Sequence, residues 1–246
     1  MEISHKLQKL FSSIALVSAW EHGRRLLHPV DSRRIFASLD TLDFSGVRAR
    51  DGYRPNPARV RKFIEIVQDL WLDRSPPLQI LDLGCGSGYF IYICRLFGHD
   101  GMGLDTDVEP LYRETLAILN VPRVVSRIEA QVPLPDLDRK FDLVAATRVC
   151  FHFKGWPQHS PGDEWREADW EFFVNDIRTR FLNPHGRLFL QFNPRRDDSP
   201  FFTPALRDCF LNLGGRIVRS KALFAANPAE VPQFKQRTSR NSSRGC

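Results

Sequence analysis

Short apolar runs alternate along the middle of the chain with stretches in which apolar residues recur at helical spacing. Residues 80–83 and 141–146 are almost continuously apolar, which is typical of strands buried on both faces of a parallel sheet. The other runs are shorter or more mixed and end at turn residues. The predicted strands are residues 80–83, 102–105, 123–128, 141–146, 187–192 and 216–219, and residues 221–225 extend the last strand or pair with it as a seventh.

Amphipathic stretches between these strands predict helices. The apolar positions of residues 58–71 follow helical spacing and stop before Ser75-Pro76-Pro77, and Gly214-Gly215 ends the last such stretch. Strands that alternate with helices over residues 78–225 predict an α/β fold with a doubly wound, mostly parallel sheet of seven strands. The predicted helices are residues 58–71, 90–97, 110–119, 172–182 and 204–213.

The two ends of the chain differ in composition from this middle part. Residues 3–27 carry an apolar stripe that predicts a helix, either packed on the domain or serving as a substrate lid or an interfacial membrane helix. Residues 29–57 are polar and predicted to be irregular, whereas Pro, Ser, Arg and Asn dominate the last twenty residues and predict disorder. The predicted units are an N-terminal helical extension or lid at 1–57, a ligand-binding domain at 58–226 and a basic tail at 227–246.

Charge and cysteine content indicate which binding partners and which cellular compartment to expect. Residues 63–215 carry 16 Lys+Arg and 22 Asp+Glu, a net charge of −6, so the chain's excess of +6 comes from its ends. Basic ends suit RNA or an anionic lipid surface, although solvated ends are more common. The five cysteines are scattered without C-x-x-C or metal-ligand spacing, which favours free thiols, no metal site and a cytoplasmic location. No window approaches 18 uninterrupted apolar residues, so we expect no spanning helix.

A glycine-rich turn follows the first strand. Gly84, Gly86 and Gly88 read G-x-G-x-G, with Asp82 two residues ahead and a predicted helix directly after. A strand, a glycine turn and a helix together aim backbone N–H groups at a ligand. The dinucleotide fingerprint is G-x-G-x-x-G. An acidic residue at position 82 would repel a pyrophosphate but suits a cationic amino group, so an NAD-dependent oxidoreductase fits less well.

This combination resembles motif I of the class I S-adenosylmethionine (SAM)-dependent methyltransferases. The strand Phe141-Asp142-Leu143-Val144 and the run from Leu182 to Leu190 are similar to the fourth strand and to the later turn and strand of that family. The resemblance covers residues 58–225 and implies a Rossmann-like sheet and SAM as cofactor. The cofactor-binding residues that it implies are Asp82, Gly84, Cys85, Gly86, Gly88, Asp105, Thr106, Ile128, Glu129 and Thr147.

The resemblance also implies individual roles. Asp82 would receive the amino group of the methionine part of SAM, directly or through water. Asp105, at the tip of the second strand, would hold the ribose hydroxyls, with Asp107 as its competitor for that role. Glu129 falls where the family contacts adenine. Each of these residues follows or ends a predicted strand, where α/β sheets bind their ligands.

Candidate catalytic residues follow the fourth strand. His152 has a pKa range suited to taking a hydroxyl proton, and a histidine that only lines the pocket is the equal alternative. Arg148 could bind an anionic acceptor or form an ordinary ion pair. Phe151, Phe153 and Trp156 could form an apolar acceptor pocket or pack in the core. Methyl transfer needs mainly alignment, so a conspicuous base is not required.

The absence of two motifs bears on the methyl acceptor. The fourth strand is not followed by N/D-P-P-Y/F, and no Pro-Cys pair occurs, which argues against amino-methyltransferases of DNA bases or glutamine and against cysteine-nucleophile cytosine enzymes. We therefore expect an enzyme that methylates a small-molecule, saccharide or lipid-linked acceptor, at a hydroxyl group. The alternatives are an RNA methyltransferase that uses the basic ends and a SAM-binding partner protein without turnover. The sequence shows no sign of an obligate protein partner.

Overall fold

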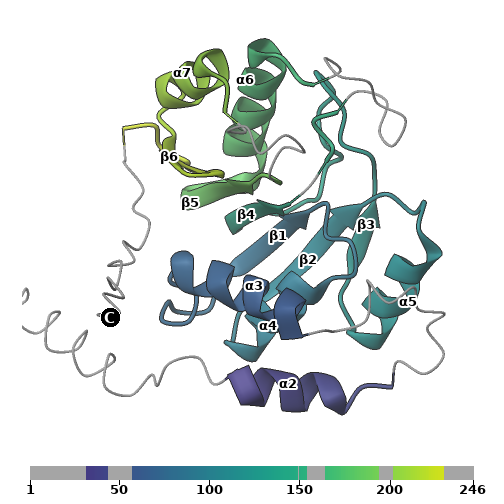
Figure 1. Ribbon diagram of the computed structural model, residues 1–246. Coiled ribbons are helices and arrows are strands. Elements are labelled where there is room, and N and C mark those ends of the chain that lie inside the picture. The colour runs from purple at the N-terminus through teal and green to yellow at the C-terminus, as the bar shows by residue number, and fades with distance from the viewer. Residues whose placement is uncertain (1–31, 44–56, 149, 154–163, 194–201, 230–246) are drawn as a thin grey trace, which may run out of the picture.

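Seven strands form one sheet in the order β3-β2-β1-β4-β5-β7-β6 in the computed structural model (Figure 1). Strands β1 to β5 pair in parallel, whereas β7 runs antiparallel to both of its neighbours. The fold predicted from the pattern is confirmed. The strands are β1 (Gln79–Leu83), β2 (Asp100–Asp105), β3 (Arg123–Val125), β4 (Phe141–Thr147), β5 (Leu182–Gln191), β6 (Arg216–Val218) and β7 (Lys221–Ala225).

The structure describes residues 32–43, 57–148, 150–153, 164–193 and 202–229. The helix predicted at 3–27 and the tail from residue 230 onward lie outside the described residues, and so does Trp156. The division of the chain into three units therefore stays a prediction. Within the described part, no helix is long and apolar enough to cross a membrane.

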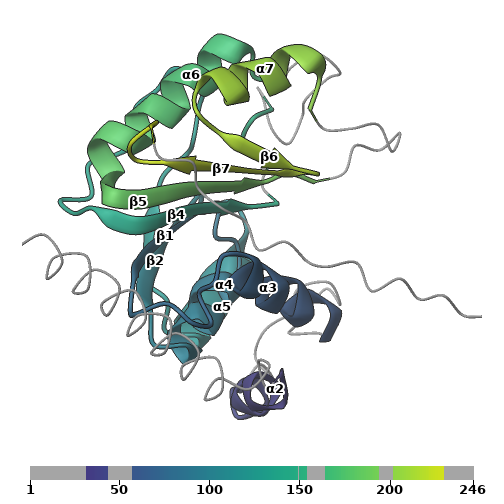
Figure 2. The ribbon, with the colours of Figure 1, turned by 90° about the vertical axis from the view of Figure 1, so that its left-hand side faces the viewer.

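Helices cover both faces of the sheet (Figure 2). On one face lie α6, the π-helical turn that follows it, and α7; on the other lie α3, α4 and α5, with α2 outside α3. The helical elements are α2 (Ser32–Asp40), α3 (Pro57–Asp69), α4 (Tyr89–Leu96), α5 (Pro110–Ile118), α6 (Glu167–Asp176), the π-helical turn (Ile177–Phe181) and α7 (Pro204–Asn212).

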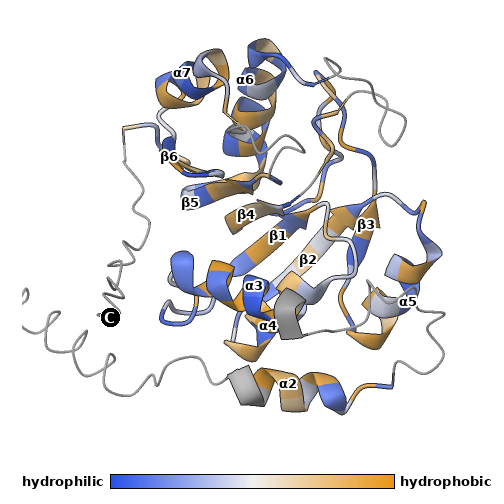
Figure 3. Ribbon diagram, viewed as in Figure 1, coloured by the Kyte–Doolittle hydropathy of each residue, from blue (hydrophilic) through white to orange (hydrophobic). Residues whose placement is uncertain are grey.

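Each central strand contributes side chains to two cores. In β1, Leu81 and Leu83 pack under α6 and α7, whereas Ile80 packs under α3 and α4. Successive side chains of a strand point to opposite faces, so a strand covered on both sides must be apolar throughout. Figure 3 shows the result as hydrophobic colouring along β1 and β4, beside helices of mixed hydropathy. Asp82 is the exception in this run, and it faces the same side as Ile80.

Two details of the fold differ from the sequence-based expectation. The segment predicted to be irregular contains α2, which buries Ile35 and Leu39, one helical turn apart. That pattern is too short to stand out in a polar segment. The predicted helix 172–182 is observed as α6, which begins earlier, followed by the π-helical turn. The predicted turn 183–186 is a bulge inside β5, where Phe141 pairs with Leu182 and Leu143 with Arg187.

Asp142 anchors three strands at the amino edge of the sheet. Its Oδ2 accepts a hydrogen bond from the backbone N–H of Gln79 at 2.8 Å, and its Oδ1 accepts one from Asn183 Nδ2 at 2.7 Å. One side chain on β4 thus fixes the start of β1 and the bulged start of β5. Asp142 lies at the opposite edge of the sheet from the carboxyl ends of the strands, where ligands bind in such folds. Its contacts are therefore structural.

His99 joins the connection between α3 and β1 to the start of β2. Its Nδ1 accepts from the backbone N–H of Leu78 at 3.1 Å, so Nε2 carries the proton and donates to the carbonyl of Leu72 at 2.8 Å. His99 is 4% exposed. Two backbone groups with little access to water therefore depend on one imidazole.

We expect His99→Ala to lower the free energy of unfolding by about 2–4 kcal/mol, because each buried polar group that loses its partner costs about 1–3 kcal/mol. Urea unfolding followed by circular dichroism measures the change. The exposed His185 is the control, and His185→Ala should change the value by less than about 0.5 kcal/mol. Equal effects of the two substitutions would contradict the role given to His99.

Candidate functional site

The glycine turn between β1 and α4 adopts backbone conformations that glycine tolerates best. Gly86 and Gly88 have φ angles of +51° and +77°. A Cβ on Gly88 would also lie 2.5 Å from the side chain of Leu116, so this residue fits only without a side chain. Gly88 is the N-cap of α4. The turn therefore brings bare backbone to the carboxyl end of β1, next to the start of a helix.

Asp82 is the buried carboxylate below this turn. Asp82 is 1% exposed, and its Oδ1 has no hydrogen-bond partner in the described structure. Burial, and then the negative charge of Asp105, raise the pKa of Asp82 well above its ordinary value. An unsatisfied buried carboxylate oxygen is costly, and a cationic donor from a ligand would remove that cost.

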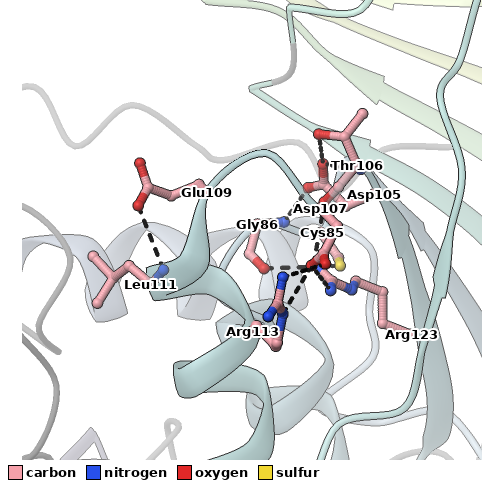
Figure 4. Close-up of polar contacts among 9 residues, drawn as sticks. All are labelled: Cys85, Gly86, Asp105, Thr106, Asp107, Glu109, Leu111, Arg113 and Arg123. Carbon is pink, nitrogen blue, oxygen red and sulfur yellow. Dashed lines mark hydrogen bonds and ion pairs between the residues drawn. The ribbon is translucent and has the colours of Figure 1, made fainter.

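Asp105 connects the tip of β2 to the glycine turn (Figure 4). Its Oδ2 accepts from the backbone N–H of Gly86 at 2.6 Å, and its Oδ1 accepts from the backbone N–H of Thr106 at 2.7 Å. The hydroxyl of Thr106 also donates to Oδ1, at 3.3 Å. A carboxylate offers about four acceptor positions, so these three contacts leave one position for a hydroxyl group of a ligand. The ends of strands β1 and β2 thus place one carboxylate each beside the same glycine turn.

Asp107, the predicted competitor of Asp105, is engaged elsewhere (Figure 4). Arg113 and Arg123 both donate to its carboxylate, and these hydrogen bonds, Arg113 first, lower the pKa of Asp107. Arg123 also donates from Nη1 to the carbonyl of Thr106 at 3.1 Å. The contacts favour Asp105 for ligand binding, because its position faces the turn and Asp107 is held by two cations.

Arg123 is the residue of this site that the sequence analysis missed. It begins β3, where the register pairs it with Gly103, two residues before Asp105. Only the length of its side chain lets the guanidinium reach the loop beyond β2. The side chain is 8% exposed. The contact between Arg123 and the loop after β2 could have been suggested by knowing that β3 lies next to β2. No local sequence motif marks it.

The other predicted cofactor residues lie in the glycine turn, at the end of β4 and after β3. Cys85 is buried in the turn, and burial followed by the charges of Asp82 and Asp105 raises the pKa of its thiol. Thr147 ends β4 and is half-buried beside Gln191 of β5. The remaining two predicted residues, Ile128 and Glu129, follow β3.

Those two residues have different surroundings. Ile128 is 7% exposed and packs in the core under α6 and α7. Glu129 is exposed and forms an ion pair with Arg127 at 3.4 Å. Their assignment to the adenine of the cofactor stays a prediction.

His152 lies in an aromatic cluster rather than in an open cleft. It is 2% exposed, and the rings of Phe153, Phe192 and Trp170 lie 4.2, 5.8 and 5.9 Å from its own. Phe151 packs on the rings of Trp165 and Phe173, at 5.3 Å in both cases. The described aromatic residues after β4 thus serve packing. A catalytic role for His152 stays a prediction.

No group of three or more His, Cys, Asp or Glu side chains that could hold a metal ion occurs among the residues described. The site is instead a pair of carboxylates beside a glycine turn.

A sequence model of a methyltransferase domain matches residues 53–235, about three quarters of the chain. This protein belongs to that methyltransferase family. Its cofactor is accordingly SAM, as the resemblance of the glycine turn implied. Among curated proteins, no sequence matches the chain.

Several solved structures match the chain at low sequence identity. A protein from Pyrococcus horikoshii OT3 is 22% identical over 58% of this chain and 62% of its own, with a TM-score of 0.42. An O-methyltransferase family protein from Burkholderia thailandensis is 13% identical over 67% and 55%, with a TM-score of 0.44. A TehB-like SAM-dependent methyltransferase from Corynebacterium glutamicum is 19% identical over 69% and 97%, with a TM-score of 0.43. The chain thus spans less than two thirds of the first two proteins.

The residues of the methyltransferase site fit SAM. The unsatisfied oxygen of Asp82 suits the ammonium group of the methionine part, and the remaining acceptor position of Asp105 suits a ribose hydroxyl. The turn at Gly86 and Gly88 leaves its backbone open to close approach. The two carboxylates also match the positive charge that SAM carries on its sulfonium and amino groups.

We expect Asp82→Asn to stabilise the free methyltransferase at neutral pH and to weaken SAM binding. Because the folded-state pKa of Asp82 is raised, its contribution to stability is complete below the ordinary value of 3.8 and is lost as pH rises through the folded-state pKa. Asparagine cannot ionise and removes that loss, so the free energy of unfolding should rise by about 1–3 kcal/mol. Thermal unfolding with and without SAM separates the two effects. A variant that is less stable without ligand and binds SAM normally would contradict the assignment.

Arg123 and Arg113 share Asp107, which provides a matched comparison. We expect Arg123→Ala to weaken SAM binding roughly tenfold or more, since it removes charge-assisted hydrogen bonds to Asp107 and to the carbonyl of Thr106 beside Asp105. Arg113→Ala removes only the exposed partner and should change the affinity less than about threefold. Calorimetric titration measures both. Equal losses would show that Arg123 does not position Asp105.

Proposed function

We propose that the protein transfers the methyl group of SAM to a hydroxyl group of a small-molecule or saccharide-type acceptor. The observation that carries this proposal is the pairing of Asp82 and Asp105 at adjacent strand ends, with one Asp82 oxygen lacking a donor. In the bound state, Asp82 receives the ammonium group and Asp105 a ribose hydroxyl. The cofactor is thereby fixed at both ends before the acceptor arrives.

When bound, SAM supplies an activated methyl carbon: its bond to sulfur breaks as the acceptor oxygen bonds to it, the electron pair stays on sulfur in S-adenosylhomocysteine, and the hydroxyl proton is released. The protein's own contribution is mainly alignment. Thr147 ends β4, the neighbour of β1, so its backbone lies at the same edge of the sheet as the glycine turn. The burial of His152 among aromatic rings supports packing as its role, so the proton would pass to water or to another group of the acceptor.

The charge of the domain favours a small acceptor over RNA. Residues 63–215 carry a net charge of −6, which repels a polyanion from the sheet that bears the site. A nucleic acid would have to be held by the basic ends, far along the chain from the glycine turn. A binding protein without turnover would need the same cofactor contacts, and only product formation separates it from an enzyme.

Two measurements test the proposal together. Calorimetric titration of the full chain with SAM should give a dissociation constant in the micromolar range, and Asp105→Ala should weaken it by at least tenfold. Cell extract incubated with protein and methyl-tritiated SAM should then yield label in the small-molecule fraction.

Each other outcome excludes a part of the proposal. Label in RNA that ribonuclease releases would favour the RNA methyltransferase. SAM binding with no labelled product in any fraction would favour a partner protein without turnover. A folded sample that binds no SAM would overturn the site assignments themselves.

A further inference from the structure

The carboxyl ends of β4 and β5 meet at a residue with an unusual backbone. Arg148 follows β4 and has a φ of +58°, a conformation that costs free energy in a residue other than glycine. Its backbone N–H donates to the carbonyl of Gln191, the last residue of β5, at 2.7 Å. Strain of this kind persists only where surrounding contacts hold it in place, and it gathers at functional sites.

Asn193 supplies those contacts from the neighbouring strand end. Its Nδ2 donates to the backbone carbonyl of Arg148 at 2.8 Å, and its Oδ1 accepts from Arg148 Nε at 3.1 Å. One amide side chain thus fixes both the main chain and the side chain of Arg148. The same Nδ2 lies 3.6 Å from Cys150 Sγ, which further orients the amide.

The guanidinium of Arg148 keeps its charge available. It is exposed, and no carboxylate pairs with it anywhere in the described structure, so the predicted alternative of an ordinary ion pair is not seen there. By contrast, Arg113 and Arg123 are both paired with Asp107. Asn193 is neutral and engages only Nε of Arg148, so the two terminal nitrogens can donate together to a planar or tetrahedral oxyanion.

Gln191 gives an independent sign of a ligand at this edge. Its Oε1 is buried and has no hydrogen-bond partner in the described residues. Phe189 and Ala145 pack on the face of the sheet that Asp82 also faces, so Gln191 and Thr147, each two residues further along, lie on that face as well. Asp82, Ala145 and Phe189 lie side by side in the sheet register. The unsatisfied oxygen of Gln191 therefore lies on the same face as Asp82, two residues nearer the carboxyl edge.

We propose that Arg148, held by Asn193, binds a carboxylate or phosphate group of the methyl acceptor, and that Gln191 Oε1 accepts a hydrogen bond from a donor on the same molecule. The inference rests on the proposed function and names the class of its acceptor: a hydroxylated molecule with one anionic group. In a domain of net negative charge, a cation held in place at this edge attracts a small anionic group, while the charge of the domain as a whole disfavours a polyanion.

Nuclear magnetic resonance of the full chain saturated with S-adenosylhomocysteine tests the subsite directly. The signals to follow are the Nε–H of Arg148 and the side-chain amide of Asn193. The probes are 4-hydroxybenzoate for a carboxylate, phenyl phosphate for a phosphate and neutral 4-hydroxybenzamide. We expect saturable shifts of both signals with one of the two anions, at least tenfold tighter than with the amide, and the tighter anion identifies the source of the oxyanion.

Three variants at the proposed subsite and one control variant separate recognition of the anion from effects on the structure. Arg148→Gln should abolish the tighter binding of the anion, while Arg148→Lys should retain part of it, since lysine keeps the charge but loses the fork. Asn193→Ala should weaken anion binding several-fold through loss of the orientation of Arg148. Arg207→Gln, which replaces an exposed arginine on α7, should leave it unchanged. Calorimetry should show unaltered SAM affinity in all of them.

The outcomes also distinguish this inference from the proposed function. If the wild-type chain binds SAM but the neutral amide shifts both signals as strongly as the anions, the anion subsite is overturned and the methyltransferase proposal stands. If Arg148→Gln binds the anion within twofold of the wild-type affinity, the anion subsite is also overturned. A chain that binds no SAM would remove the basis of both proposals.

Discussion

The hydrogen bond from the backbone N–H of Gly86 to Asp105 is the contact on which the geometry of the candidate cofactor site depends. It joins the turn after β1 to the tip of β2, so two loops that are separate in sequence become one surface. A charged acceptor makes this bond stronger than a neutral one would be. Because the same carboxylate also holds the N–H of Thr106, a shift of either loop disturbs both contacts. Asp82 then lies below a turn whose position is already fixed.

Charge is distributed around this contact in a way that serves binding more than stability. Asp82 and Asp105 are close enough for one to raise the pKa of the other, and burial adds to the effect. Asp107 would worsen this repulsion, but Arg113 and Arg123 neutralise it. The free protein thus keeps an unfavourable carboxylate that a cationic ligand relieves. Such a site sacrifices some stability of the unliganded state for affinity.

The sequence predicted the sheet and the centre of the site because both depend on local patterns. The apolar runs of β1 and β4, the spacing from Gly84 to Gly88 and the carboxylate of Asp105 could all be read along the chain. Arg123 and Asn193 could not, because each acts through a side chain that reaches a loop after a neighbouring strand. The bulge of β5 was also missed, since Asn183-Pro184 resembles a turn unless Asp142 on β4 is known to bind it.

Asp142 fastens the starts of β1 and β5 at the amino edge, whereas the ligand contacts lie at the opposite edge. The two tasks of the sheet are therefore separated in space. In the proposed site the loops after β1 and β2 would hold the cofactor, and the loops after β4 and β5 could change without loosening the strands beneath them. If Arg148 and Asn193 recognise the acceptor as proposed, mutations near them would alter the substrate range and leave the cofactor contacts intact. The sheet would then combine a donor side and an acceptor side that can vary independently.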